Sequence, residues 1–155
     1  MHFRCTFDQA ARIAGLNKKK LSDDRCIMRR EFGRDFLPTA RIGQPLLCSM
    51  ADCVALMLYA DFRRDGYPVK VAGVIASHFR AAIREFPNAD QLTAIKLSNG
   101  ATFVRPTDDK RLEAEFRAGR HIATELTINI DDLRERVRRG AESRHPVEEA
   151  AHEVA

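Results

Sequence analysis

Two short helices joined by a tight turn are predicted by the stretch Thr6-Phe-Asp-Gln-Ala-Ala-Arg-Ile-Ala-Gly-Leu-Asn-Lys-Lys-Lys-Leu21. Thr6 is followed three residues later by Gln9, which is the spacing of a capping box at a helix start. Gly15 can adopt the left-handed conformation that reverses the chain after the first helix. Asn17 is a favoured N-cap residue for the second helix, which then opens with three lysines.

The same stretch has the spacing of a helix-turn-helix. Ala10, Ile13 and Ala14 give the first helix a small apolar face, and Leu21 stands six positions after Gly15. Small residues, a glycine turn and a following apolar residue let two helices cross closely. The segment resembles the N-terminus of the MerR-like winged helix-turn-helix proteins, and the resemblance implies a DNA-binding regulator.

The second half of the resemblance lies in Pro45-Leu-Leu-Cys-Ser-Met-Ala-Asp-Cys-Val-Ala-Leu56. This stretch is similar to the strand and capped helix that follow the wing in that family. Ser49 and Asp52 have capping-box spacing, and the helix after them is apolar on nearly every side, which indicates a central position. A second core helix is predicted to end before Pro87, so the resemblance covers about residues 3–86 of a domain over 1–88.

A wing is expected between these two halves. Phe36-Leu37 and Leu46-Leu47 are short apolar arms around a tip that contains Arg41 and Gly43, and this pattern favours a hairpin. In a winged helix-turn-helix Arg41 would then meet phosphate or the minor groove. A plain surface loop is the alternative.

A small α+β unit is predicted over residues 91–140, which makes the whole chain α+β. Asn99-Gly100 between two alternating runs is a strong hairpin signal, and a further strand is expected over 121–130. Short helices are expected over 108–118 and 132–139. From residue 141 the chain is polar without an apolar period, which predicts a disordered tail over 141–155.

So small a sheet needs a partner surface, either the core helices or a second copy across a dimer axis. MerR-like proteins commonly dimerise through a long coiled-coil helix, and this sequence predicts no helix of that length. A homodimer is nevertheless expected, because two half-sites multiply a modest affinity for each.

The positive charge is concentrated at the N-terminal end. Residues 1–45 hold 10 Lys and Arg against 5 Asp and Glu, whereas residues 46–90 are balanced and residues 91–155 carry a net charge of −1. This excess is expected of a segment that binds phosphates. A solvated basic face without a partner is the alternative.

The candidate DNA-binding residues are Lys18, Lys19, Lys20, Arg25, Arg29, Arg30 and Arg41. The three lysines are expected to position the helix on phosphates, and Arg25 and Arg29 to contact bases. Asp23 and Asp24 depart from the motif, because an apolar residue is normal three positions after Leu21. Either the helix restarts at Ser22, or the motif is degenerate and binds protein.

The expected function is therefore sequence-specific binding of double-stranded DNA in transcription control. The alternatives are a protein-interaction module, such as an adaptor or anti-activator, and a phage-type recombination or packaging factor. No enzyme motif occurs, so neither catalysis nor a cofactor is expected, and a metal site from Cys48, Cys53 and a histidine (His78 or His121) has no fixed geometry. No signal peptide or 18-residue apolar run occurs, which favours a cytoplasmic protein away from membranes.

Overall fold

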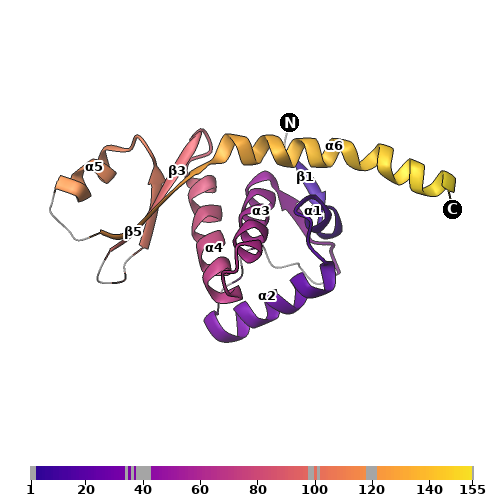
Figure 1. Cartoon of the computed structure of the whole chain (residues 1–155), viewed down its shortest axis with the longest axis horizontal. Coiled ribbons are helices and arrows are strands. Elements are labelled where there is room, and N and C mark those ends of the chain that lie inside the picture. Colours follow the sequence, from indigo (N-terminus) through magenta and orange to yellow (C-terminus); the bar gives the residue numbers. More distant parts are fainter. Residues whose placement is uncertain are drawn as a thin grey trace.

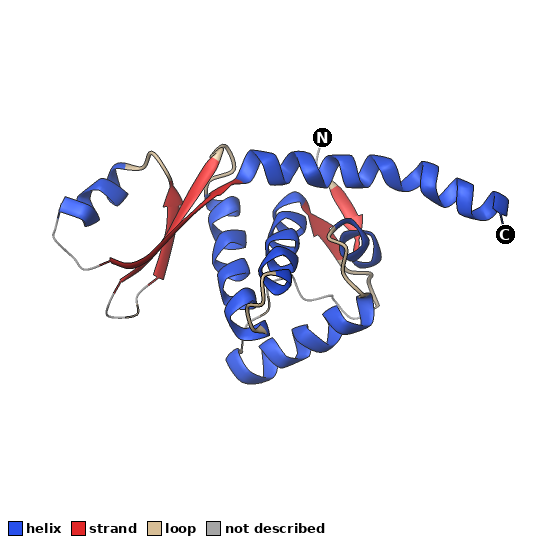
Figure 2. Cartoon of the chain, viewed as in Figure 1, coloured by secondary structure: helices blue, strands red, loops and turns tan. Residues whose placement is uncertain are grey.

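The computed structural model of the chain describes residues 3–33, 35, 37, 43–97, 100, 102–117 and 122–154. The fold is mixed α+β, as predicted, with helices and two small antiparallel sheets (Figures 1 and 2). The helices α1 to α4 gather on one side, and the three-stranded sheet lies beyond α4 (Figure 1). Helix α6 begins where the sheet ends and runs across the group of helices α1 to α4, away from the sheet (Figure 1).

A two-stranded sheet ties the first helix to the central one. Strand β1 (Arg4–Thr6) pairs antiparallel with β2 (Leu47–Ser49), with Cys5 opposite Cys48. Each strand runs directly into a helix, α1 (Phe7–Ile13) and α3 (Met50–Arg64). Both predicted capping boxes are present, because the Thr6 and Ser49 hydroxyls each accept from the backbone N–H three residues later.

This pairing corrects the predicted hairpin. Leu47 lies opposite Thr6 in the two-stranded sheet, and Leu37, the described residue of the other arm, is in no strand. The arms Phe36-Leu37 and Leu46-Leu47 therefore do not form the expected pair at these two residues. Strand β1 provides the partner, and its three residues are too few to show an alternating pattern in the sequence. Arg41 lies outside the described residues.

The turn between α1 and α2 (Lys18–Phe32) has the predicted geometry. Gly15 has a positive φ of 71°, and the Asn17 side chain accepts from the backbone N–H of Lys20. Helix α2 is continuous over its 15 residues, so of the two alternatives left open by the sequence, the restart at Ser22 is wrong. A restart is unnecessary because the polar residue that suggested it, Asp24, is hydrogen-bonded inside the protein.

Helix α3 is the centre of the core, as predicted from the apolar residues on nearly every side of it. Helix α4 (Val69–Glu85) packs beside it. Helices α2 and α4 approach closely at Gly73. A Cβ atom there would lie 2.6 Å from Sδ of Met28, which is fully buried on α2. The core thus fixes which face of α2 points inward.

The C-terminal sheet contains the predicted hairpin and the predicted third strand. Strands β3 (Gln91–Leu97), β4 (Thr102–Pro106) and β5 (Ile122–Asn129) are ordered β4-β3-β5, with all pairs antiparallel. Leu92 and Val104 belong to the same core as the N-terminal helices. The sheet therefore packs on the core helices, while its other face, with Ile95 and Leu97, packs against Leu112 of α5 (Lys110–Arg117).

Helix α6 (Ile130–Val154) overturns two predictions. Its 25 residues exceed the short helix expected over 132–139, and it continues through 141–154, where a disordered tail was expected. Leu133 and Val137 anchor its first turns in the core. Once anchored, a helix can propagate without a further apolar period, because each added residue extends an existing turn.

Candidate functional site

Helix α2 presents two chemically different faces. The buried face holds Leu21, Asp24, Arg25 and Met28. The exposed side holds most of the cationic residues that were predicted to bind DNA: Lys18, Lys19, Lys20, Arg29 and Arg30. Asp23 and Glu31 are the exposed carboxylates of the same helix. Cationic side chains thus outnumber anionic ones on the part of α2 that faces solvent.

Asp24 faces inward. Tyr59 of α3 donates its phenolic hydrogen to Oδ2 of Asp24 over 2.5 Å, and both side chains are buried. Burial, and then this hydrogen bond, raises the pKa of Tyr59 above its usual range. Asp24 therefore occupies a buried position at which the sequence resemblance led us to expect an apolar residue, and it has a phenol as its partner. Because the Asp24 carboxylate points inward, it adds no negative charge to the exposed face of α2.

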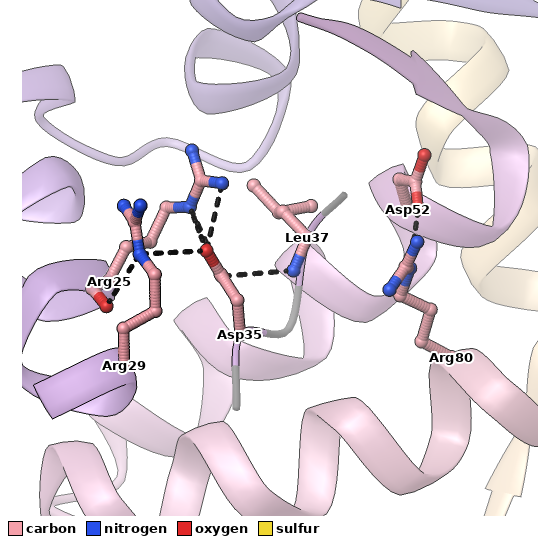
Figure 3. Close-up of polar contacts among 6 residues, drawn as sticks. All are labelled: Arg25, Arg29, Asp35, Leu37, Asp52 and Arg80. Carbon is pink, nitrogen blue, oxygen red and sulfur yellow. Dashed lines mark hydrogen bonds and ion pairs between the residues drawn. The ribbon is translucent and has the colours of Figure 1, made fainter. Parts of the chain in front are cut away.

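Arg25 also faces inward, and this corrects its predicted role as a base-contacting residue. Only 8% of the residue is exposed. Its Nε donates to both carboxylate oxygens of Asp35, at 3.1 and 3.0 Å, and its Nη2 lies 2.9 Å from Oδ2 (Figure 3). The guanidinium also lies 5.3 Å from the centre of the Phe7 ring. Arg25 holds α2 against the segment that follows it.

Asp35 is an anchor that the sequence did not identify. Its side chain is 7% exposed and also accepts from the backbone N–H of Leu37 at 3.1 Å. Figure 3 shows Arg25 and Arg29 both converging on this carboxylate from α2. A second ion pair drawn there joins Asp52 of α3 to Arg80 of α4, with 2.6 Å between Oδ1 and Nε. Neither pairing has a sequence signature, because the partners are 10 and 28 residues apart.

Arg29 and Arg30 keep solvent access. Arg29 places Nε 3.4 Å from Oδ2 of Asp35, yet 48% of its side chain is exposed. The Arg30 side chain is 74% exposed, and its Nη2 lies 3.9 Å from Oε1 of Glu31. At that distance and exposure the pair contributes little and leaves Arg30 able to contact a partner.

The three lysines lie at the start of α2. Lys18 forms an exposed ion pair with Asp8, with 2.7 Å between Nζ and Oδ1. Lys20 lines a cavity of about 210 Å³ together with Arg63 and Arg64 of α3. These two arginines were not predicted, because nothing in the sequence brings the end of α3 beside the turn. Arg64 donates to the carbonyl of Ala14 at 2.7 Å, which fixes that contact.

Three buried cysteines lie in and next to the two-stranded sheet: Cys5 and Cys48 belong to its strands, and Cys53 belongs to α3. Sγ of Cys5 lies 3.4 Å from Sγ of Cys53, and Cys48 stands opposite Cys5 in the strand pair. Burial raises the pKa of Cys48 to about 12. The hydrogen bond with Cys5, followed by burial, raises the pKa of Cys53. In the described part of the chain no three His, Cys, Asp or Glu side chains are arranged to hold a metal ion.

None of the helices described is both long and apolar enough to span a membrane. The chain matches no protein-family model, and comparison with curated proteins finds no relative. The functional inference therefore depends on the arrangement of side chains on α2 and around it.

Proposed function

We propose that this protein is a sequence-specific, double-stranded DNA-binding transcription regulator that inserts the exposed side of α2 into the major groove. The observation that carries the proposal is the inward orientation of Asp24 and Arg25. With both buried, the exposed side of α2 keeps five cations against two carboxylates. A helix of this charge, joined to its predecessor by a tight glycine turn, is suited to a phosphate-lined groove.

The exposed cations divide into two roles by position. Lys18, Lys19 and Lys20 stand at the N-terminal end of α2, where backbone N–H groups also favour anions, so they are assigned to phosphate contacts. The ion pair of Lys18 with Asp8 is exposed and weak, which lets a phosphate replace the carboxylate. Arg29 and Arg30 are assigned to base edges, because a guanidinium binds guanine through two hydrogen bonds.

The proposed assembly is a homodimer. Helix α6 spans roughly 37 Å for its 25 residues, and its C-terminal part extends past α1, away from the other helices (Figure 1). An extending helix is a natural surface for a second copy, and two copies would read two half-sites. Sedimentation equilibrium of the whole chain and of a chain ending at Gly140 tests this, because only the whole chain should dimerise.

A protein-interaction module remains the second candidate. The exposed carboxylate of Asp23 favours it, since this group lies among the cations on α2. That alternative depended on two acidic residues, Asp23 and Asp24, and Asp24 is buried. Of the two, only Asp23 therefore remains exposed to a protein partner. A phage-type recombination or packaging factor would use the same DNA surface, so it differs from a regulator only in sequence preference.

The decisive experiment measures binding of the purified protein to random-sequence duplex DNA across a salt series, followed by selection of the bound sequences. Salt-steep binding that enriches a palindrome supports a dimeric regulator. Salt-steep binding without an enriched motif supports an architectural or packaging role. Absence of binding at low salt overturns the proposal and favours the interaction module.

Variants in the same assay separate the two assigned roles. Replacing Arg29 by Ala should relax sequence preference by about 1–3 kcal/mol at the contacted base, whereas Lys19→Ala should weaken binding to every sequence. Lys110→Ala is the matched control, because Lys110 is an exposed lysine on α5, outside the proposed surface. Equal behaviour of the arginine and lysine variants would show that the roles are wrongly assigned.

A further inference from the structure

A largely apolar groove of about 520 Å³ lies between α4 and the three-stranded sheet. One wall is formed by α4 and the end of α3, and the other by β3, β4 and β5, through Ala94, Thr102 and Leu126 among others. Figure 1 shows why two walls are available: the sheet lies beyond α4, on the side away from α3. The groove is thus distinct from the exposed side of α2.

The α4 wall is an apolar stripe that the fold leaves partly uncovered. Val71, Val74 and Ile75 recur at the three- and four-residue spacing of one helix face, and Tyr67 precedes them by one turn. Tyr67 and Val71 are among the exposed large apolar residues, at 43% and 38%. Val74 and Ile75 are half-buried at the groove. A stripe of this kind is usually covered by another element or by a ligand.

The charged groups of the groove, the ammonium groups of Lys70 and Lys96, share one sign. Lys70, His78 and Lys96 line it, and no carboxylate belongs to its described lining. Nζ of Lys70 lies 4.8 Å from the centre of the Phe32 ring, at the end of α2. A solvent-exposed ammonium group over a ring gains little, so Lys70 can turn toward an anion in the groove at small cost.

We propose that this groove binds a small apolar molecule that carries one anionic group, a carboxylate or a sulfonate. The volume lies within the range of about 300–1,000 Å³ for small-molecule sites, and an apolar lining with a few convergent polar groups is their usual composition. The apolar body would cover Val74 and Ile75, and Lys70 and Lys96 would neutralise the anion. The proposal is independent of DNA binding.

The charge also argues against a second copy of this chain as the occupant. A symmetric dimer through this groove would place four ammonium groups in one interface, those of Lys70 and Lys96 from both copies, and the described lining has no carboxylate to pair with them. Like charges across an interface oppose association. An apolar anion would cover the apolar residues of α4 and pair with the ammonium groups of Lys70 and Lys96.

The test is a fluorescence titration of the whole chain with 8-anilinonaphthalene-1-sulfonate at pH 7, where the probe is an apolar anion. We expect saturable binding at one site per chain, displaced by dodecanoate more effectively than by the neutral dodecan-1-ol. Equal displacement by both compounds, or no saturable binding, would overturn the proposal.

Variants locate the site. Lys70→Gln and Lys96→Gln should each weaken probe binding by about two- to fivefold, the range expected for a partly exposed ion pair. Val74→Asp should weaken it at least about tenfold by placing a carboxylate among the apolar residues. Lys110→Gln, a lysine outside the groove, is the matched control and should leave binding unchanged.

Thermal unfolding and sedimentation of each variant accompany the titration. If Val74→Asp fails to fold, the two lysine variants alone decide the result, because both positions are exposed. Unchanged probe binding in both lysine variants overturns the proposal. A dimer that Val71→Asp dissociates also overturns it, because the groove would then be an interface between copies.

Discussion

The two faces of α2 use the same residue types for opposite purposes. On the buried face, Arg25 is fixed by Asp35, and Asp24 by Tyr59, so charge and polarity there determine how the helix sits. On the exposed side, the Lys19, Lys20 and Arg30 side chains remain in contact with solvent. A cation on α2 can therefore be assigned to binding or to folding only when the face on which it lies is known.

The largest expected effect comes from breaking the buried ion pair. Arg25→Ala should lower the free energy of unfolding by about 3 kcal/mol, because it leaves the Asp35 carboxylate buried without its main partner. Urea denaturation measures this. The double variant Arg25→Met/Asp35→Leu should recover much of the loss, since no charge is then left buried. A loss in Arg25→Ala no greater than that in Arg30→Ala would contradict the distinction between the two faces.

A smaller effect is expected at Asp24. Tyr59→Phe removes the phenolic donor and leaves the carboxylate unsatisfied, which should destabilise the protein by about 1–3 kcal/mol. Adding Asp24→Leu to that variant should restore stability, because no buried polar group is then left without a partner. The same denaturation series measures both. If the double variant is less stable than Tyr59→Phe alone, Asp24 has a further partner in the fold.

Alkaline pH should lower the free energy of unfolding through the buried thiol of Cys48 in the two-stranded sheet. The pKa of Cys48 is raised from 9.0 to about 12, so the folded protein holds this proton where the unfolded chain releases it. The contribution of this thiol to the free energy of unfolding is therefore fully present below pH 9 and is lost as the pH rises toward 12. At pH 10 the loss from this thiol is about 1.4 kcal/mol. The raised pKa of Tyr59 acts in the same direction. Denaturation at pH 7 and pH 10 measures the difference, and Cys48→Ala should reduce it.

The smallest effect on stability is expected on the exposed side. Lys19→Ala and Lys20→Ala should each change the free energy of unfolding by no more than about 0.5 kcal/mol. In the DNA titration each should reduce the slope of log affinity against log salt by about 1. A large loss of stability with an unchanged slope would reverse the assignment of these lysines from binding to folding.

Local chemistry explains which predictions the structure confirms. The capping boxes at Thr6 and Ser49, the positive φ of Gly15 and the Asn17 cap were all predictable, because each depends on residues within three or four positions. The hairpin around Gly100 was predictable for the same reason. Fold class followed from these elements, since their order already mixes helices with antiparallel strands.

The errors have a common origin in distant partners. Arg25 was assigned to bases because no local pattern pairs it with Asp35, and the arm at Leu47 was given the wrong partner because β1 has three residues. The tail after Gly140 was predicted to be disordered because apolar period was the criterion, whereas helix α6 is anchored upstream by Leu133 and Val137.

The sequence by itself determined where helices begin, where the chain turns and where positive charge accumulates, because those properties depend on neighbouring residues. Only the tertiary structure decided which charges on α2 face solvent and which groove α4 shares with the sheet. Those outcomes depend on contacts between residues far apart in the chain, such as Asp24 with Tyr59 and Met28 with Gly73. A charged side chain of α2 that is buried stabilises the fold, and one that is exposed is available to a partner.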